Sequence, residues 1–131
     1  MSKTFNKLNK AAAFHSQRDG SRNHCAVIAL AAAAGVSFGK AATVLRDMGR
    51  KDNTVGTSVS ALVCGATKLG LKVSDKAMVV SGTAQRFAAN TPEGMFFVIT
   101  TGHVACVKNG ELVDHEQGFR KKIVAVLEIS A

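Results

Sequence analysis

Cys25 stands where the sequence changes from polar to wholly apolar. Asn23 and His24 precede it, and every residue from Cys25 to Ala34 is apolar, which predicts a helix that begins at the cysteine. The unpaired N–H groups and the positive dipole end of a helix N-terminus stabilise a thiolate over a thiol. Cys25 is therefore a candidate nucleophile.

Residues 102–114 (GHVACVKNGELVD) predict a β-hairpin that carries both a histidine and a carboxylate. Asn109-Gly110 is a dipeptide favoured in two-residue hairpin loops. With this loop, the numbers of directly paired residues sum to 219, so Val107 is expected opposite Leu112.

The alternation of side chains along a strand decides which residues of this hairpin share a face. His103 and Asp114 fall on one face as diagonal neighbours, roughly 7–8 Å apart at the backbone and within reach of a side-chain hydrogen bond. Cys106 and His115 fall on the opposite face. The register therefore selects His103 and Asp114 as a candidate pair of base and orienting group, although a bulged turn would shift the register by one residue and undo the choice.

Composition indicates one globular domain. The chain has 131 residues, of which 47% are hydrophobic and 20% charged, enough for a core without disulfide or metal support. Its three cysteines are irregularly spaced, which fits a reducing compartment better than a secreted disulfide scaffold. No C-x-x-C or H-x-x-x-H pair occurs, so we expect neither a metal site nor a cofactor. Cys64 is interpreted as a structural residue, since free cysteine packs as a small hydrophobe.

The formal net charge is +8, and the first 22 residues are rich in basic side chains. We expect residues 1–22 to form a flexible arm on a single domain of residues 23–131. Such an arm could bind nucleic acid or another polyanion, or it could simply be solvated. The absence of Trp, Tyr and RGG-like patterns favours the solvated arm. The basic residues concerned are Lys3, Lys7, Lys10, Arg18 and Arg22.

Helices are predicted in the N-terminal half and strands in the C-terminal half. The first helix is apolar all round, so it must be surrounded by protein. β-branched and aromatic runs at residues 95–100, 103–107, 111–115 and 123–129 predict an antiparallel sheet, with one or two short strands in residues 71–80. This order gives the α+β class, with the helix that starts at Cys25 packed on the sheet. The limits of three helices are predicted at Cys25 and Gly35, at Ser37 and Gly49, and at Thr57 or Ser58 and Gly70. A fourth, short helix is predicted to be capped by Ser81-Gly82-Thr83, to run through Phe87 and to end before Pro92.

The apolar run after Cys25 also bears on location. It is too short to span a bilayer, and it follows a polar segment, unlike the core of a signal peptide. We therefore expect a cytoplasmic protein that has no contact with membranes.

With these elements in place, the chain resembles the papain-like cysteine peptidase fold. It looks most like the small papain-like or peptidase-like proteins common in bacteriophages, which carry a cysteine at the start of an Ala-rich helix and a later G-H-x-x-A-V-x-x-G-x-x-x-D hairpin. The matching stretches are residues 23–31, 94–98 and 102–114, the last with Cys106 in place of the alanine of the hairpin pattern, and the order of elements is compatible over residues 23–129. A phage-encoded protein of this kind would act in the host cytoplasm.

The resemblance implies a role for each candidate. Cys25 would be the nucleophile, His103 the general base that takes its proton, and Asp114 the group that orients His103. The backbone N–H of Cys25 would be one donor to an oxyanion.

The second oxyanion donor of papain-like enzymes does not match. It is a glutamine about six residues before the cysteine, and Asp19 holds that position here. Gln17 and Asn23 are the nearest candidates. This departure leaves open whether the site turns over a substrate.

Two functions remain open at this point. The first is a thiol-dependent amide hydrolase or acyl-transfer enzyme that acts on a protein or peptide. The second is a non-catalytic binding protein on the same fold, such as a phage factor that engages a host protein or nucleic acid through a basic surface. On the second alternative Cys25 is an inert core cysteine, His103 an ordinary strand histidine and Asp114 a surface acid.

Overall fold

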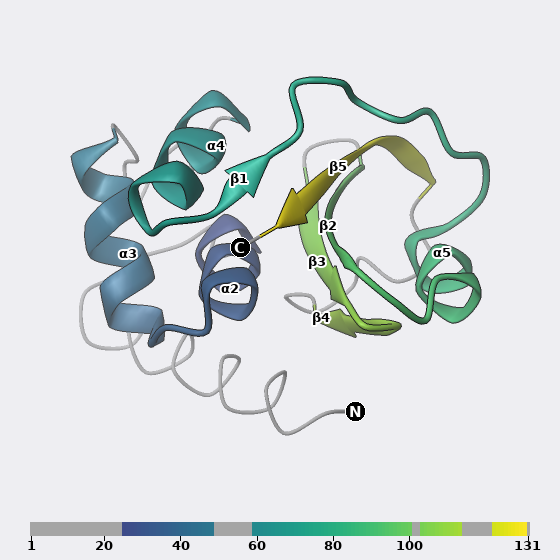
Figure 1. The fold of residues 1–131 in the computed structure, drawn as a ribbon, viewed down its shortest axis with the longest axis horizontal. Coiled ribbons are helices and arrows are strands. Elements are labelled where there is room, and N and C mark those ends of the chain that lie inside the picture. The colour runs from purple at the N-terminus through teal and green to yellow at the C-terminus, as the bar shows by residue number, and fades with distance from the viewer. Residues whose placement is uncertain (1–24, 49–58, 101–102, 114–121, 131) are drawn as a thin grey trace.

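Helix α2 (Cys25–Ala34) lies between the other N-terminal helices and a sheet in the computed structural model, which describes residues 25–48, 59–100, 103–113 and 122–130 (Figure 1). Its residues from Ala26 to Ala33 are all buried, as predicted for a helix that is apolar all round. Gly35 follows with φ 68°, the left-handed conformation expected after a helix end. The α+β class, with helices first and an antiparallel sheet later, is confirmed.

Two more helices pack beside α2. Helix α3 (Phe38–Asp47) begins after Ser37, whose hydroxyl accepts the backbone N–H of Lys40 at 3.1 Å, which confirms the predicted N-cap. Helix α4 (Val59–Lys68) is followed by Gly70 with φ 90°. The other predicted limits of these two helices, at residues 49 and 57–58, lie outside the described residues.

The sheet has five strands in the order β1-β5-β2-β3-β4, and every neighbouring pair is antiparallel. The strands are β1 (Lys72–Val73), β2 (Met95–Thr100), β3 (His103–Lys108), β4 (Glu111–Val113) and β5 (Ile123–Ser130). The short β1 was expected within residues 71–80, and the remaining strands match the predicted runs to within a few residues.

The β3–β4 hairpin has the register that the sequence predicts. Val107 lies opposite Leu112, and the pairs on either side also sum to 219. Both loop residues have positive φ, 51° for Asn109 and 82° for Gly110, as a type I′ turn requires.

Each face of the sheet covers its own apolar cluster. The larger cluster joins α2, α3 and α4 to one face and includes Phe97, Val104 and Cys106. The smaller one joins the other face, through Val98 and Val107, to helix α5 (Ala84–Asn90). Helix α5 begins after Thr83, the last of the three residues predicted to cap it, and it continues three residues past Phe87 but ends before Pro92, as predicted.

A bulge interrupts the pairing of β2 with β5 near the end of β2. Ile99 pairs with Ala125 and Thr100 pairs with Ile123, so Val124 has no opposite residue and is 56% exposed. Such an extra residue increases the local twist and changes where the neighbouring side chains point. The alternation of apolar and polar residues in the sequence does not reveal this bulge.

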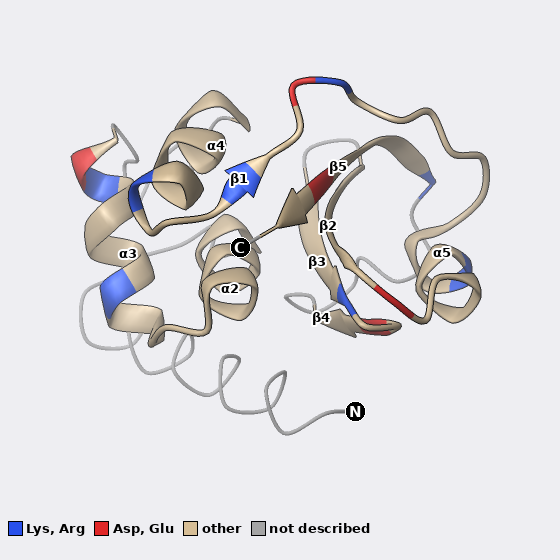
Figure 2. Cartoon of the chain, viewed as in Figure 1, with Lys and Arg blue, Asp and Glu red and all other residues tan. Residues whose placement is uncertain are grey.

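The segment after β1 follows the free edge of β5 without forming a regular strand. Met78 forms an isolated bridge with Val126, and Thr83 forms one with Lys122. The described charged residues lie on α3 and α5, at the end of α4, on β1 and the loop after it, and near strand ends, whereas α2 carries none (Figure 2).

Two of the apolar side chains on α4 are exposed to solvent. Cys64 is one of them, so it does not pack as the small hydrophobe that its interpretation as a structural residue assumed. Val59, at the first turn of the helix, is 43% exposed. The buried side of α4 consists of Ala61, Leu62, Gly65 and Ala66. A Cβ at position 65 would lie 3.0 Å from the Leu45 side chain and 3.4 Å from that of Leu30, so their close approach favours a glycine there.

None of the helices in the described part of the chain is both long and apolar enough to cross a bilayer on its own. Of these helices, only α2 and α3 taken together have the length and apolar composition of a membrane span, and the angle between them is 113°.

Candidate functional site

The Cys25 thiol and the His103 side chain are joined by a hydrogen bond. Cys25 is the first residue of α2, and His103 is the first residue of β3. Both side chains are half-buried. The structure therefore brings together the two residues that sequence reasoning selected from opposite ends of the chain.

The surroundings of Cys25 favour its thiolate. Burial is the largest single influence and acts to raise the pKa of Cys25, but the hydrogen bond and positive charge of His103 act against it. The backbone N–H groups of Val104 and Ala26 also donate to the sulfur. Together these donors outweigh burial, and the pKa of Cys25 lies below its ordinary value.

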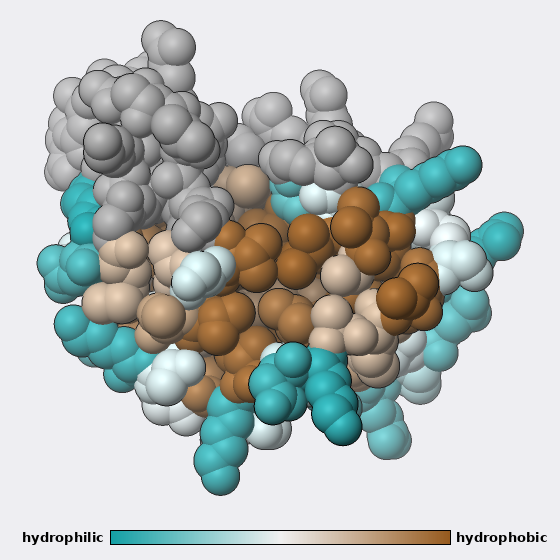
Figure 3. All heavy atoms as spheres, turned by 90° about the horizontal axis from the view of Figure 1, so that it is seen from above, coloured by the Kyte–Doolittle hydropathy of each residue, from teal (hydrophilic) through white to brown (hydrophobic). Residues whose placement is uncertain are grey.

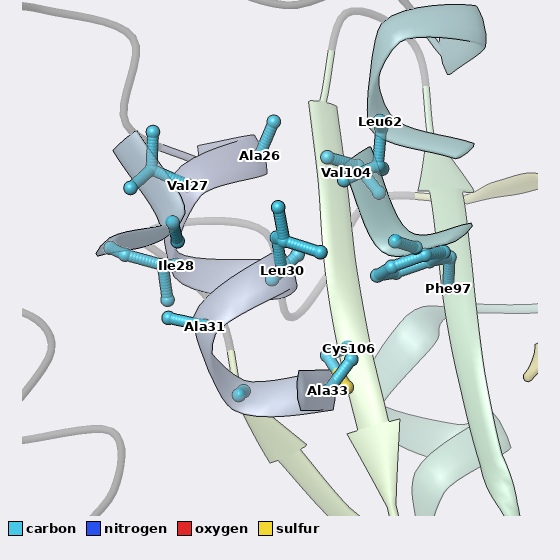
Figure 4. Packing of buried hydrophobic residues seen from close by; sticks show 14 of the residues in the cluster. Ala26, Val27, Ile28, Leu30, Ala31, Ala33, Leu62, Phe97, Val104 and Cys106 are labelled. Atoms are coloured by element: carbon cyan, nitrogen blue, oxygen red, sulfur yellow. The ribbon is translucent and has the colours of Figure 1, made fainter. Parts of the chain in front are cut away.

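The packing of α2 along β3 sets the position of the thiol. Figure 4 shows Leu30 and Ala33 on the side of α2 that faces β3, with Ala26 at the same end as Val104 and Ala33 beside Cys106. The helix and the strand therefore run in the same direction, and their first residues meet at one end.

A second contact fixes this alignment at the far end. The Lys108 Nζ, on the last residue of β3, donates to the Ala32 carbonyl near the end of α2 at 3.4 Å. A cation there also complements the negative end of the helix dipole. This contact and the one between Cys25 and His103 join α2 to β3 at both ends, with the thiol level with His103.

The backbone of His103 is held from the neighbouring strand. Thr100, on β2, is the directly paired residue, and its hydroxyl donates to the His103 carbonyl at 3.5 Å. Thr100 is only 3% exposed, the one buried polar side chain among the described residues. It lies beside the bulge at Val124.

Sequence reasoning missed the roles of Thr100 and of the Val104 N–H. A threonine at the end of an apolar strand, three residues before a candidate catalytic histidine, is a signal for Thr100. The Val104 contact has no sequence signal, since it depends on how α2 docks against the strand.

Several predicted site residues lie outside the described residues. These are the carboxylate Asp114, the oxyanion candidates Gln17 and Asn23, and the basic residues Lys3, Lys7, Lys10, Arg18 and Arg22. The hairpin register that placed Asp114 diagonally from His103 holds up to Val113, the residue before it.

The other two cysteines differ sharply from Cys25. Cys106 is fully buried beneath α2, and burial raises its pKa to about 12. Cys64 is exposed on α4. Cys25 combines a lowered pKa with partial access to solvent.

Within residues 25–48, 59–100, 103–113 and 122–130, no three His, Cys, Asp or Glu side chains are grouped so as to hold a metal ion.

The arrangement thus consists of a half-buried, hydrogen-bonded Cys–His pair at a helix N-terminus, on an α+β fold. The chain matches no protein-family model, and no curated protein or solved structure is found to be similar to it.

Proposed function

We propose that this protein is a thiol-dependent amide hydrolase or acyl-transfer enzyme in which Cys25 is the nucleophile and His103 the general acid and base. The observation that carries the proposal is the hydrogen bond between these two side chains at the first residue of α2. Nucleophile and base within hydrogen-bond reach are the requirement for this chemistry. A papain-like architecture and a peptide or protein substrate belong to the same proposal.

The reaction follows from the pair. The Cys25 thiolate attacks the carbonyl carbon of an amide, forming a C–S bond, and the carbonyl oxygen takes up the negative charge. His103, as imidazolium, gives its proton to the leaving nitrogen as the C–N bond breaks, which leaves a thioester and a free amine. Water then attacks the thioester while His103 takes its proton, and breaking of the C–S bond releases the acid and the thiolate. An amine in place of water gives acyl transfer.

The environment of the sulfur supports the first step. Two backbone N–H groups, of Ala26 and Val104, and the His103 ring all stabilise negative charge at this position. The same features would serve no purpose for an inert core thiol, and Cys106, which is such a thiol, has the opposite shift in pKa.

The first experiment measures thiol reactivity. Iodoacetamide labelling of each cysteine, followed by mass spectrometry near neutral pH, should modify Cys25 fastest, since its lowered pKa raises its thiolate fraction. Cys64 is the exposed reference and Cys106 the buried one within the same chain. If Cys25 reacted no faster than Cys64, catalysis would be abandoned in favour of a non-catalytic binding protein.

The second experiment looks for turnover. A Cys25→Ala variant should retain a substrate that the wild type cleaves, so proteins captured by the variant from a lysate can be compared with the fragments that the wild type produces. A Cys64→Ala variant is the matched control, and it should behave as the wild type does. Cleavage that persists in Cys25→Ala would contradict the proposed nucleophile.

A further inference from the structure

A row of aliphatic side chains crosses the sheet from the thiol to its far edge. Val104, whose N–H donates to the Cys25 sulfur, lies directly opposite Ile99 on β2, and Ile99 lies directly opposite Ala125 on β5. Directly paired residues share a face of the sheet, so these three side chains are on the face that α2 covers. Met78 forms an isolated bridge with Val126, and Val79 is the next residue along that edge of β5, so we place it at the Ala125 end of the row.

The row becomes more accessible with distance from α2. Val104 is 7% exposed, Ile99 and Ala125 are half-buried, and Val79 is 92% exposed. Ile99 and Cys25 both pack at the margin of the large apolar cluster. The row therefore begins under the helix that carries the thiol and ends at the surface.

Apart from His103, no charged side chain occurs in the segments that form this row, residues 77–81, 97–100, 103–105 and 123–126. Figure 3 views the molecule from above Figure 1, the side on which β2 ends and β3 begins, and it shows apolar side chains in the middle of this face with hydrophilic ones around its margin. A surface of this kind in a chain of net charge +8 is a candidate contact site.

We propose that the row is the binding surface for an extended, aliphatic segment of a polypeptide substrate whose scissile carbonyl lies at Cys25. This inference rests on the proposed function, and it adds the kind of substrate that the site accepts. Four strand positions span three spacings of about 4.8 Å, or roughly 14 Å, which is the length of about four residues of extended chain. The segment would cross the strands, with its aliphatic side chains against Ile99, Ala125 and Val79.

The shape of the surface favours a polypeptide over a lipid bilayer. A bilayer would contact the fully exposed Val79 but would not follow the row down to the half-buried Ile99. A single extended chain can contact both the exposed Val79 and the half-buried Ile99 and still reach the half-buried thiol.

The test compares two probes that carry the same vinyl sulfone electrophile. One bears an acetylated tetrapeptide of leucine and alanine, and the other has serine and asparagine in the same positions. We expect the aliphatic probe to modify Cys25 about tenfold faster, a ratio typical of apolar contacts in enzyme pockets. A Val79→Lys variant should lose most of this preference.

Met78→Lys is the matched control. Met78 is adjacent to Val79 and 40% exposed, and alternation directs its side chain to the other face, so the same change should leave the preference intact. Iodoacetamide, which has no peptide part, should modify Cys25 at the same rate in the wild type and both variants, which also shows that they are folded.

The two proposals fail in different ways. If iodoacetamide does not select Cys25, the proposed function fails. If it does, but the two peptide probes react equally or Val79→Lys keeps the preference, only the inference about the row is overturned. If Val79→Lys reduces sedimentation with vesicles of an anionic phospholipid and leaves the peptide preference unchanged, the row is a lipid-binding surface and the inference is likewise wrong.

Discussion

The state of the Cys25 thiol depends on a balance between burial and hydrogen bonding. Burial raises its pKa, and His103 contributes both a hydrogen bond and a charge that lower it. In His103→Ala the burial remains without this compensation, so the pKa of Cys25 should rise. The midpoint of the rate of iodoacetamide labelling against pH should move to higher pH, and the rate near neutral pH should fall by about tenfold or more.

Cys64 serves as an internal control in the same measurement of labelling rate against pH. Cys64 is exposed on α4, so its labelling should be the same in the wild type and in His103→Ala. An unchanged midpoint for Cys25 in the variant would mean that no thiolate–imidazolium pair exists.

The proposed role of Asp114 is tested by two substitutions. Removing an orienting carboxylate costs on the order of 10²–10⁴-fold in triad enzymes, whereas loss of the nucleophile removes the covalent pathway. We therefore expect Asp114→Ala to slow turnover less than Cys25→Ala does, and Asp114→Asn to be milder still, because an amide can also orient an imidazole. Turnover is measured with any substrate captured by Cys25→Ala, and equal rates in Asp114→Ala and the wild type would remove Asp114 from the site.

At the scale of elements, the β3–β4 turn holds the strand that carries His103. Gly110 has φ 82°, and a Cβ there would lie 3.2 Å from the Pro92 Cα. Gly110→Ala should therefore lower the free energy of unfolding by about 1–2 kcal/mol, as measured by urea denaturation.

Gly39→Ala is the matched substitution without either constraint. Gly39 lies within α3, and its added Cβ would meet no atom within 4 Å. Alanine is the better helix former by about 0.5–1 kcal/mol, so this variant should be more stable than the wild type. Equal destabilisation by both substitutions would argue against a type I′ turn at Asn109-Gly110.

Local patterns were enough to predict the elements but not how they meet. The apolar run after Cys25, the cap at Ser37 and the Asn109-Gly110 turn are each specified by a few adjacent residues, and each was predicted correctly. The bulge at Val124 and the alignment of α2 with β3 depend on contacts between distant segments. The Val104 donor and the apolar row are consequences of those contacts, so the sequence alone could not predict them.

At the scale of the whole molecule, the net charge of +8 raises the question whether the basic N-terminal segment binds a polyanion. If residues 1–22 bind a polyanion, their removal should weaken retention on nucleic acid and flatten its dependence on salt, because each phosphate contact releases counterions. Retention is measured by filter binding over a range of salt concentrations, and labelling of Cys25 shows whether the truncated protein is folded. Unchanged retention would show that residues 1–22 are not a polyanion-binding site. We expect no strong preference for a particular nucleic-acid sequence in either case.

The meeting of α2 and β3 has a practical consequence. The groups that activate Cys25 come from a strand far along the chain, and Cys106 is protected by the same helix. Unfolding should therefore slow the alkylation of Cys25, accelerate that of Cys106 and leave Cys64 almost unaffected. The chain carries three native thiols that report on its own unfolding, with an internal standard, and no fluorophore needs to be introduced into a protein that lacks tryptophan and tyrosine.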